Sequence, residues 1–216
     1  MAYLLMQPKQ IETTMRTPQE LVHIKHTISL RQYKYWCIML RAFREACELG
    51  LQPDEDQFYR IKLTDVGKYM GYVPKRAELK ADMDALRKEA IIYNVLSKDK
   101  RPVMRGAGFI SEWEISDASL GFTFPTFLSD LVRNMDYNND MFMKLNWSIF
   151  NAFTGKYEAL VWKLCRDFAG SGQTKDLALP ALREYFGLRD NEYQEFKDLN
   201  KFVISGPAKR VSVDAR

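Results

Sequence analysis

Cysteine and histidine are scarce in this sequence. Among 216 residues there are three cysteines, Cys37, Cys47 and Cys165, and two histidines, His23 and His26. The cysteines show no CxxC spacing, which argues against a disulfide framework and against a cysteine-based zinc site. The two histidines have no cluster of acidic or thiol ligands beside them, and two imidazoles make at best half a metal site. We therefore expect buried free thiols, structural histidines and no bound metal.

Long apolar runs and nucleotide-binding motifs are also missing. No run approaches the roughly 20 residues that span a bilayer, the start of the chain lacks the pattern of a signal peptide, and there is no GxxxxGK[ST] motif. We expect a soluble, cytoplasmic protein that binds no membrane and no cofactor and has no catalytic activity of its own. A net charge of +4 and a pI of about 8.8 give weak support for a nucleic-acid partner.

The apolar content is sufficient for packed domains. Hydrophobic residues make up 46% and aromatic residues 13% of the chain, too much for a disordered protein. The patterns predict a core helix around WCIMLRAF, a helix over 75–90 with Leu79, Met83, Leu86 and Ala90 on its apolar face, and a helix in PTFLSDLVRNM. They predict strands at 58–63, 91–96, 109–115 and in SLGFTF, a brief extended piece in DLALP, a strand-like tail in VSVDAR and a loose arm over residues 1–20.

One order of elements occurs twice. YRIKLTDVGKYMGY (59–72) and KDLALPALREYFGL (175–188) each contain an extended piece, a short helix and a glycine, and Leu63 precedes Gly71 by the same distance as Leu179 precedes Gly187. A helix with an aromatic residue and a cysteine comes before each segment. A polar turn and an amphipathic helix follow each, over 75–90 and 192–203. We expect Thr64 to cap the first short helix.

This order is typical of a winged helix, a helix-turn-helix with a β-hairpin beside it. The second helix packs its apolar face, and its other face is free to enter a DNA major groove. We therefore predict an α+β fold of two tandem winged-helix domains related by internal duplication, residues 1–145 and 146–216. Helix-turn-helix units also serve as plain packing motifs, so that alternative stays open.

In the first domain, the candidate DNA-binding residues are basic. They lie on helix 75–90 and in the charged loop KDKRPVMRG, which would be a wing that contacts phosphate: Lys75, Arg76, Lys80, Arg87, Lys98, Lys100, Arg101 and Arg105. Acidic residues share the helix, so a solvated face of charge pairs is the alternative.

In the second domain, the candidates lie in the turn or on the outer face of helix 192–203: Arg189, Asn191, Gln194, Lys197 and Lys201. Asparagine and glutamine suit adenine, and lysine suits guanine or phosphate. The opposite face, with Tyr193, Phe196, Leu199 and Val203, is predicted to be the core face. We expect Gly206 and Pro207 to end this helix.

The chain also resembles a known family. Several segments are similar to parts of iteron-binding plasmid replication initiators (Rep proteins), which contain two winged-helix domains. These segments are FMKLNWSIFNAFTGKYEALVWKLCRDF, LALPALREYFGL with YQEFKDLNKFVI, IKLTDVGKYMG and GFTFPTFLSDLV. The resemblance covers roughly residues 20 to 213 and follows apolar and turn positions. One departure is that the chain ends at Arg216, where a second wing would begin, so the second domain is expected to be truncated or shortened there.

The resemblance implies a function. Such initiators bind repeats of double-stranded origin DNA as monomers, open the neighbouring duplex with host replication initiator and helicase proteins, and repress their own gene as dimers through the first domain. We therefore expect an origin-binding initiator in a monomer–homodimer equilibrium. The alternatives are a winged-helix transcriptional repressor, a metal-dependent nicking enzyme, and an interaction module that has lost DNA binding.

Overall fold

The chain folds into two compact units. The computed structural model describes residues 14–18, 26–96, 102–134, 142–168 and 176–214. The first unit includes Arg31–Met135, and the second joins Glu12–Leu30 to Asp136–Arg216. The second unit therefore takes part of its chain from before Arg31 and part from after Met135.

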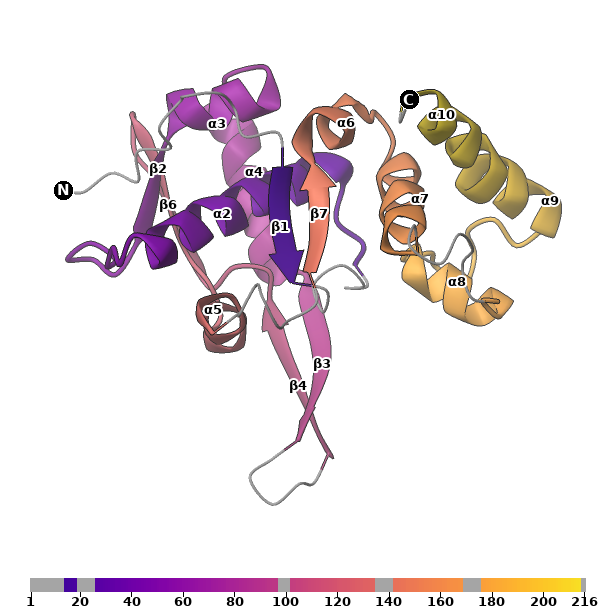
Figure 1. Cartoon of the computed structure of the whole chain (residues 1–216), viewed down its shortest axis with the longest axis horizontal. Coiled ribbons are helices and arrows are strands. Elements are labelled where there is room, and N and C mark those ends of the chain that lie inside the picture. The colour runs from indigo at the N-terminus through magenta and orange to yellow at the C-terminus, as the bar shows by residue number, and fades with distance from the viewer. Residues whose placement is uncertain (1–13, 19–25, 97–101, 135–141, 169–175, 215–216) are drawn as a thin grey trace. The chain divides into compact units, whose positions relative to one another are not determined.

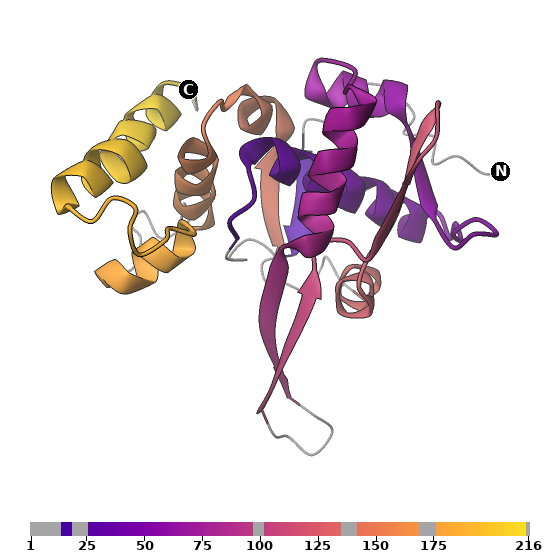
Figure 2. The same cartoon turned by 180° about the vertical axis from the view of Figure 1, so that it is seen from behind.

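The first unit combines helices with short antiparallel strands (Figures 1 and 2). Its elements are α2 (Leu30–Glu48), β2 (Tyr59–Lys62), α3 (Leu63–Met70), α4 (Arg76–Lys88), β3 (Ala90–Leu96), β4 (Pro102–Gly108), β5 (Glu112–Ile115), β6 (Ser119–Thr123) and α5 (Thr126–Arg133). One sheet has the strand order β2-β6-β5, and β3 pairs with β4 as a hairpin. Both views show this hairpin extending beyond the helices of its unit. This unit has the helix-turn-helix and hairpin of a winged helix.

Helix α2 is central to the core of the first unit. Trp36 is fully buried, and its indole N–H donates to the carbonyl oxygen of Phe109 at 3.2 Å. The two rings meet edge to face with centroids 5.0 Å apart. Phe43 makes the same kind of contact with Tyr59 of β2 at 4.9 Å. The predicted core helix around residues 36–43 is confirmed.

Strand β4 lies where the sequence predicts a loop. Residues 102–108 pair with β3, from Ala90↔Gly108 to Leu96↔Pro102. The segment carries one charged residue, a proline and two glycines instead of alternating apolar and polar residues, so its strand conformation depends on pairing with β3. The predicted strand over 109–115 is shorter, and it pairs with β6 as β5.

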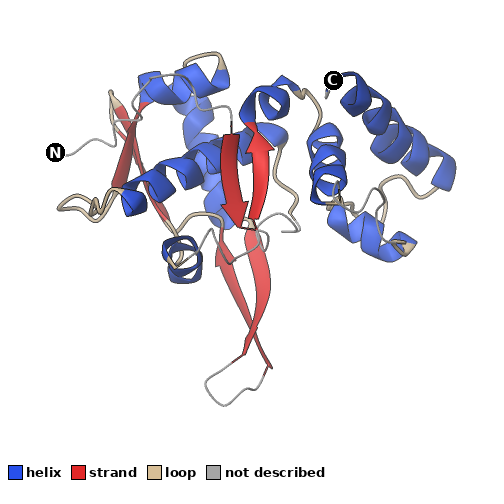
Figure 3. Cartoon of the chain, in the orientation of Figure 1, coloured by secondary structure: helices blue, strands red, loops and turns tan. Residues whose placement is uncertain are grey.

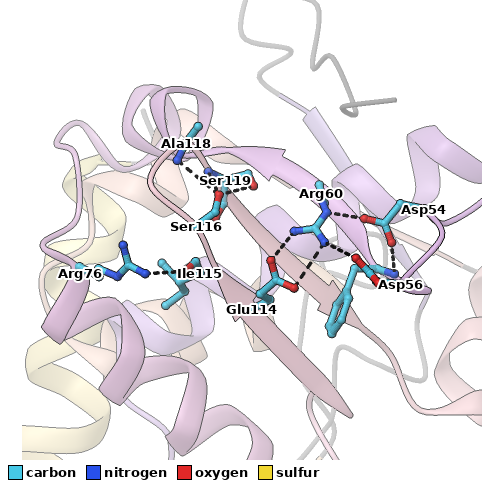
Figure 4. Close-up of polar contacts among 10 residues, drawn as sticks. Asp54, Asp56, Arg60, Arg76, Glu114, Ile115, Ser116, Ala118 and Ser119 are labelled. Atoms are coloured by element: carbon cyan, nitrogen blue, oxygen red, sulfur yellow. Dashed lines mark hydrogen bonds and ion pairs between the residues drawn. The ribbon is translucent and has the colours of Figure 1, made fainter. Parts of the chain in front are cut away.

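A buried guanidinium connects strands of the first unit (Figure 4). Arg60 on β2 pairs with Asp54, and its Nη1 atom lies 2.8 Å from Oε1 of Glu114 on β5. Asp56 lies further away, with its Oδ2 atom 3.6 Å from Arg60 Nη2. Because a buried charge is costly unless it is paired, these carboxylates hold the loop before β2 against the edge of the sheet.

In the part of the chain that the structure describes, the second unit contains helices and one strand pair (Figure 3). Its elements are β1 (Thr14–Pro18), β7 (Phe142–Asn146), α6 (Trp147–Ala152), α7 (Lys156–Asp167), α8 (Leu179–Tyr185), α9 (Phe196–Leu199), the π-helical segment η1 (Asn200–Ser205) and α10 (Gly206–Asp214). Strand β1 pairs antiparallel with β7, from Thr14↔Asn146 to Pro18↔Phe142. The prediction of a loose arm is therefore wrong for residues 14–18.

Glu158 connects the start of α7 to α10. Its carboxylate accepts hydrogen bonds from the backbone N–H groups of Thr154 and Gly155, each at 3.1 Å, and it pairs with Arg210. Burial alone would raise the pKa of Glu158, but the backbone hydrogen bonds and Arg210 outweigh burial and lower the pKa. Helix α10 packs along α7 (Figure 1), so this carboxylate helps to position the long C-terminal helix.

The elements α9, η1 and α10 form one helical run from Phe196 to Asp214. The predictions that the helix covers 192–203 and that a strand-like tail follows are both wrong. Pro207 normally ends a helix because it has no N–H to donate. Here a π-helical turn precedes it, in which the N–H of Gly206 donates to the carbonyl oxygen of Lys201. A Cβ on Gly206 would come closer than 3.0 Å to that oxygen, so glycine permits this turn.

Several boundaries differ by a few residues from those predicted. Helix α3 begins at Leu63 with Lys62 as its N-cap, so Thr64 is not the cap. DLALP forms no strand, because α8 begins at Leu179 with Pro180 in its first turn. Ala90 is exposed at the start of β3, whereas the other three predicted apolar-face residues of α4 are buried.

Two further predictions concern turns and thiols. Both short helices end at a glycine in the left-handed region, Gly71 at φ +80° and Gly187 at φ +60°, as expected for a sharp turn between two helices. With both helix-turn-helix units present, the predicted α+β winged-helix fold is confirmed. All three cysteines are free, but Cys37 alone is buried, Cys47 is half-buried and Cys165 is exposed.

Candidate nucleic-acid interface

The turn between α8 and α9 is packed closely around Gly187. The N–H of Gly187 donates to the carbonyl oxygen of Glu184 at 3.0 Å. A Cβ at this position would come closer than 3.0 Å to the carbonyl oxygen of His26. The same oxygen accepts a hydrogen bond from Lys156 Nζ at 3.1 Å. The contact with His26 therefore leaves room only for glycine at the end of α8.

Arg183 of α8 holds the turn that follows. Its guanidinium donates to three backbone carbonyl oxygens: Tyr193 at 2.8 Å, Arg189 at 3.0 Å and Glu192 at 2.6 Å. The turn is closed further by the Arg189 N–H, which donates to the Glu192 carboxylate at 2.8 Å. Hydrogen bonds from a charged donor are worth about 1.5–3 kcal/mol each, so Arg183 largely determines the path from α8 to α9.

Aromatic rings support the same turn from the inside. Tyr193 lies in the turn with a φ of +46° and is half-buried. The prediction that it lies on the core face of a helix is therefore wrong. The ring centroid of Tyr193 lies 6.1 Å from that of Tyr157 on α7 and 6.1 Å from that of Phe202. Burial, then the neighbouring Tyr193 and Glu192, raise the pKa of Tyr157 to about 12. Tyr157 is therefore neutral at physiological pH.

The helix that follows the turn has one buried face and one exposed face. Leu199 and Val203 are buried, as predicted. Lys197 and Lys201 are exposed, and neither makes an ion pair within the described ranges of the chain. Lys201 Nζ lies 4.9 Å from the ring centroid of Phe202. The exposed face thus carries two positive charges without an acidic partner in that part of the structure.

The remaining predicted residues of the second unit lie in the turn. Arg189, Asn191 and Gln194 are all exposed. Gln194 Nε2 donates to the carbonyl oxygen of Asp190 at 3.3 Å. Together with the two lysines, these are five exposed polar side chains within residues 189–201, a stretch that also contains Asp190, Glu192, Glu195 and Asp198. We call these five side chains the 189–201 surface. Its amide and cationic groups match what base edges and phosphates accept and donate.

On the first unit, Arg76 is engaged at the start of α4. Its guanidinium lies 2.7 Å from the Asp117 carboxylate. It also donates to the carbonyl oxygen of Ile115 at 2.9 Å (Figure 4). Arg87, on the same helix, is exposed and makes no ion pair with other described residues. Of these two arginines, only Arg87 is available without breaking a contact.

Lys75, the N-cap of α4, and Lys80 on α4 lie near carboxylates. Lys75 Nζ is 3.9 Å from Glu78, and Lys80 Nζ is 3.3 Å from Asp84. Lys80 Nζ also lies 5.9 Å from the ring centroid of Trp113. Exposed pairs of this kind stabilise little, up to about 1 kcal/mol, but they engage Lys75 and Lys80, whereas Lys197 and Lys201 make no ion pair with other described residues.

The basic residues of the predicted wing fall mostly outside the described structure. Lys98, Lys100 and Arg101 lie outside the described residues. Arg105 lies in β4, opposite Tyr93 of β3, and not in a loop as predicted. The backbone of this hairpin therefore has the form of a wing, and the role of its basic side chains stays a prediction.

Metal ligands do not gather in the described part of the structure. No group of three or more His, Cys, Asp or Glu side chains that could hold a metal ion occurs there. His23 lies outside the described residues, and His26 is buried. No described helix has both the length and the apolar character needed to cross a membrane.

Burial of His26 predicts a pH effect on stability. Burial, then the positive charges of Lys163 and Lys156 on α7, lower the pKa of His26 well below its ordinary value of 6.5. The unfolded chain therefore binds a proton near pH 6.5 that the folded chain does not bind. Lowering the pH from about 6.5 to about 5 is expected to reduce the free energy of unfolding, by up to about 1.4 kcal/mol per pH unit.

Urea unfolding across this pH range tests the prediction, because most carboxylates stay ionised there. His26→Gln should make the free energy of unfolding less dependent on pH. The matched substitution His23→Gln should leave this pH dependence unchanged if His26 is its source. An unchanged pH dependence in His26→Gln would contradict the assignment.

Sequence patterns did not reveal three residues of this interface. Arg183 donates to backbone carbonyl oxygens in the turn that follows α8, and Arg210 pairs with Glu158, which is distant in sequence. A pattern of apolar positions carries no signal for such contacts. Phe196 is 61% exposed at the first residue of α9, although the sequence predicts it in the core. Phe196 lies at the surface because the helix begins only at Phe196, after the turn that contains Tyr193. No local motif in the sequence marks that helix start.

Comparisons with known proteins bear on the fold. No family model matches the sequence, and no curated protein matches it. Among solved structures, the Pi initiator protein in complex with iteron DNA has a similar fold, with a TM-score of 0.65 and 15% sequence identity. The match covers 94% of this chain and 86% of that chain. At this identity the likeness shows the fold, and it extends over nearly the whole sequence.

Proposed function

We propose that this chain is an initiator of plasmid replication that binds a specific duplex DNA sequence repeated in an origin. The observation that carries the proposal is the 189–201 surface. There, Lys197 and Lys201 are exposed with no ion pair among the described residues, beside a turn that Arg183 holds in place. Support comes from the solved protein of similar fold, which was crystallised with iteron DNA.

In this proposal the helix that begins at Phe196 enters the major groove. The groove is about 12 Å wide, enough for a helix. Arg189, Asn191 and Gln194 in the turn contact base edges or nearby phosphates, and Lys197 and Lys201 bind guanine or phosphate. Because Leu199 and Val203 hold the opposite face in the core, binding would require no rearrangement of the helix.

The first unit would contribute contacts of a different kind. Lys75, Arg76 and Lys80 already have acidic neighbours, so Arg87 and the β3–β4 hairpin are the stronger candidates. In the proposal, Lys98, Lys100, Arg101 and Arg105 bind phosphates, which increases affinity without reading sequence.

The proposed role brings partners with it. The chain would recruit host replication initiator and helicase proteins, which supply the ATP-dependent work of duplex opening, and it would have no catalytic activity of its own. It would exist as monomers and homodimers, and its dimers would repress its own gene. These points follow from the family resemblance.

Selection of bound duplexes from a random DNA pool tests the proposal. The purified chain is incubated with the pool at constant moderate salt, and the bound fraction is sequenced. We expect one recurring motif, and we expect copies of it to lie as direct repeats beside an A·T-rich segment near the gene.

Other outcomes point to other functions. A bound pool no different from the input would contradict sequence-specific binding and leave only phosphate attraction. A motif present near the gene only as a lone inverted repeat would support a transcriptional repressor. Cleavage of supercoiled plasmid with Mg²⁺ or Mn²⁺ would support a nicking enzyme and overturn the proposal.

A further inference from the structure

Phe196 is an exposed aromatic residue at the position where a recognition helix starts. Its side chain is 61% exposed, and Glu195 before it is the N-cap of α9. The core beneath the helix is filled by Leu199 and Val203, which are almost fully buried. Phe196 therefore contributes little to the interior of the unit.

A comparison with Phe202 makes the exposure of Phe196 more informative. Phe202 is 48% exposed, but its ring contacts Tyr193 and lies beneath the ammonium group of Lys201. Phe196 makes no ring contact and no cation–π contact with other described residues. Of the two aromatic rings, only Phe196 is left without such a partner.

The DNA major groove offers an apolar contact partner for the ring of Phe196. The first residues of a recognition helix contact base edges, and the thymine 5-methyl is the apolar group on those edges. We propose that Phe196 contacts the 5-methyl group of a thymine and makes it a determinant of sequence preference. The inference rests on the proposed function, because it requires α9 to lie in the groove.

The surroundings of Phe196 favour DNA over a protein partner. The ring stands among exposed charged residues, Glu195, Lys197 and Asp198, whereas a specific protein interface buries about 800 Å² on each side and has an apolar centre. A single ring flanked by charges is instead suited to one methyl group between polar base edges. Lys197 beside it would bind the adjacent phosphate or guanine.

Replacement of thymine by deoxyuridine tests the inference, because it removes only the methyl group. Dissociation constants are measured for the selected duplex and for versions with each thymine replaced in turn. For the wild-type chain we expect a loss of about three- to fivefold at one or two positions, the effect of one buried methyl group. Phe196→Ala should bind the thymine and deoxyuridine duplexes equally. The control Leu177→Ala, at an exposed apolar residue outside the 189–201 surface, should retain the wild-type preference.

The results separate the inference from the function on which it rests. If Phe196→Ala keeps the same thymine preference as the wild type, the inference is wrong although specific binding stands. If Phe196→Ala changes only self-association and not DNA binding, Phe196 belongs to a protein contact and the inference is also wrong. If no motif is selected at all, the proposed function fails, and the inference fails with it.

Discussion

Replacing Gly187 with alanine is expected to destabilise the second unit by about 2–4 kcal/mol. Two effects combine at this position. Its φ of +60° disfavours any residue with a Cβ, and the added Cβ would come closer than 3.0 Å to the backbone oxygen of His26. Since backbone atoms cannot swing aside as a flexible side chain can, relief requires movement of the turn or of the His26 segment.

Gly71 provides the matched control. It ends the short helix of the first unit at φ +80°, and a Cβ there meets nothing within 4 Å. Gly71→Ala should therefore lower the free energy of unfolding by only about 1 kcal/mol, the cost of a positive φ for a residue with a Cβ. Urea unfolding of both variants measures the difference. Equal losses would show that the contact with His26 contributes nothing at Gly187.

Replacing Arg183 with glutamine is expected to lower the affinity for the selected duplex by tenfold or more. Glutamine cannot reach the three carbonyl oxygens that the guanidinium joins, so the turn should lose its single conformation, and binding would then have to order it again. Affinity for unrelated duplex should fall much less, because it depends on phosphate attraction. The ratio of the two affinities, from fluorescence anisotropy, is therefore the decisive quantity.

Arg166→Gln is the matched control for loss of charge. Arg166 is exposed on α7, and its replacement removes the same charge without touching the turn. It should change both affinities by a similar small factor. If Arg183→Gln also lowers specific and nonspecific binding equally, its role is that of a general positive charge, and the positioning role is wrong.

Local signals in the sequence predict much of the fold. The turns at Gly71 and Gly187 need a residue that adopts positive φ, and glycine marks both places in the sequence. Apolar residues at helical spacing likewise identify α2 and α4. These features depend on neighbours a few residues away, so the sequence carries them directly.

Long-range features could not be predicted in the same way. Strand β1 exists because residues 14–18 pair with 142–146, and β4 because its backbone pairs with β3. Neither segment alternates apolar and polar residues strongly enough to identify it. The helix beyond Pro207 depends on a π-helical turn, whereas glycine and proline together normally indicate a helix end.

The candidate site likewise contains features that the local sequence predicts and features that depend on long-range contacts. The polar residues of the 189–201 surface follow from helical spacing and side-chain chemistry, and all five predicted residues are exposed there. The balance of charge on α4 does not follow from spacing alone, because Arg76 pairs with Asp117 in a loop distant in sequence. Side chains that hold the site, such as Arg183, are identified only when the turn they hold is known.

The salt dependence of binding to the selected duplex tests the central claim, that the 189–201 surface is where the chain contacts DNA. Dissociation constants are measured over a range of salt for the wild type, for Lys197→Gln with Lys201→Gln, and for Lys75→Gln with Lys80→Gln, which removes the same charge from α4. Each lost phosphate contact reduces the slope of log affinity against log salt by about 0.9. We predict a slope reduced by about two for the first pair and nearly unchanged for the second. A reduction confined to the Lys75 and Lys80 variant would contradict the claim and place the DNA on α4.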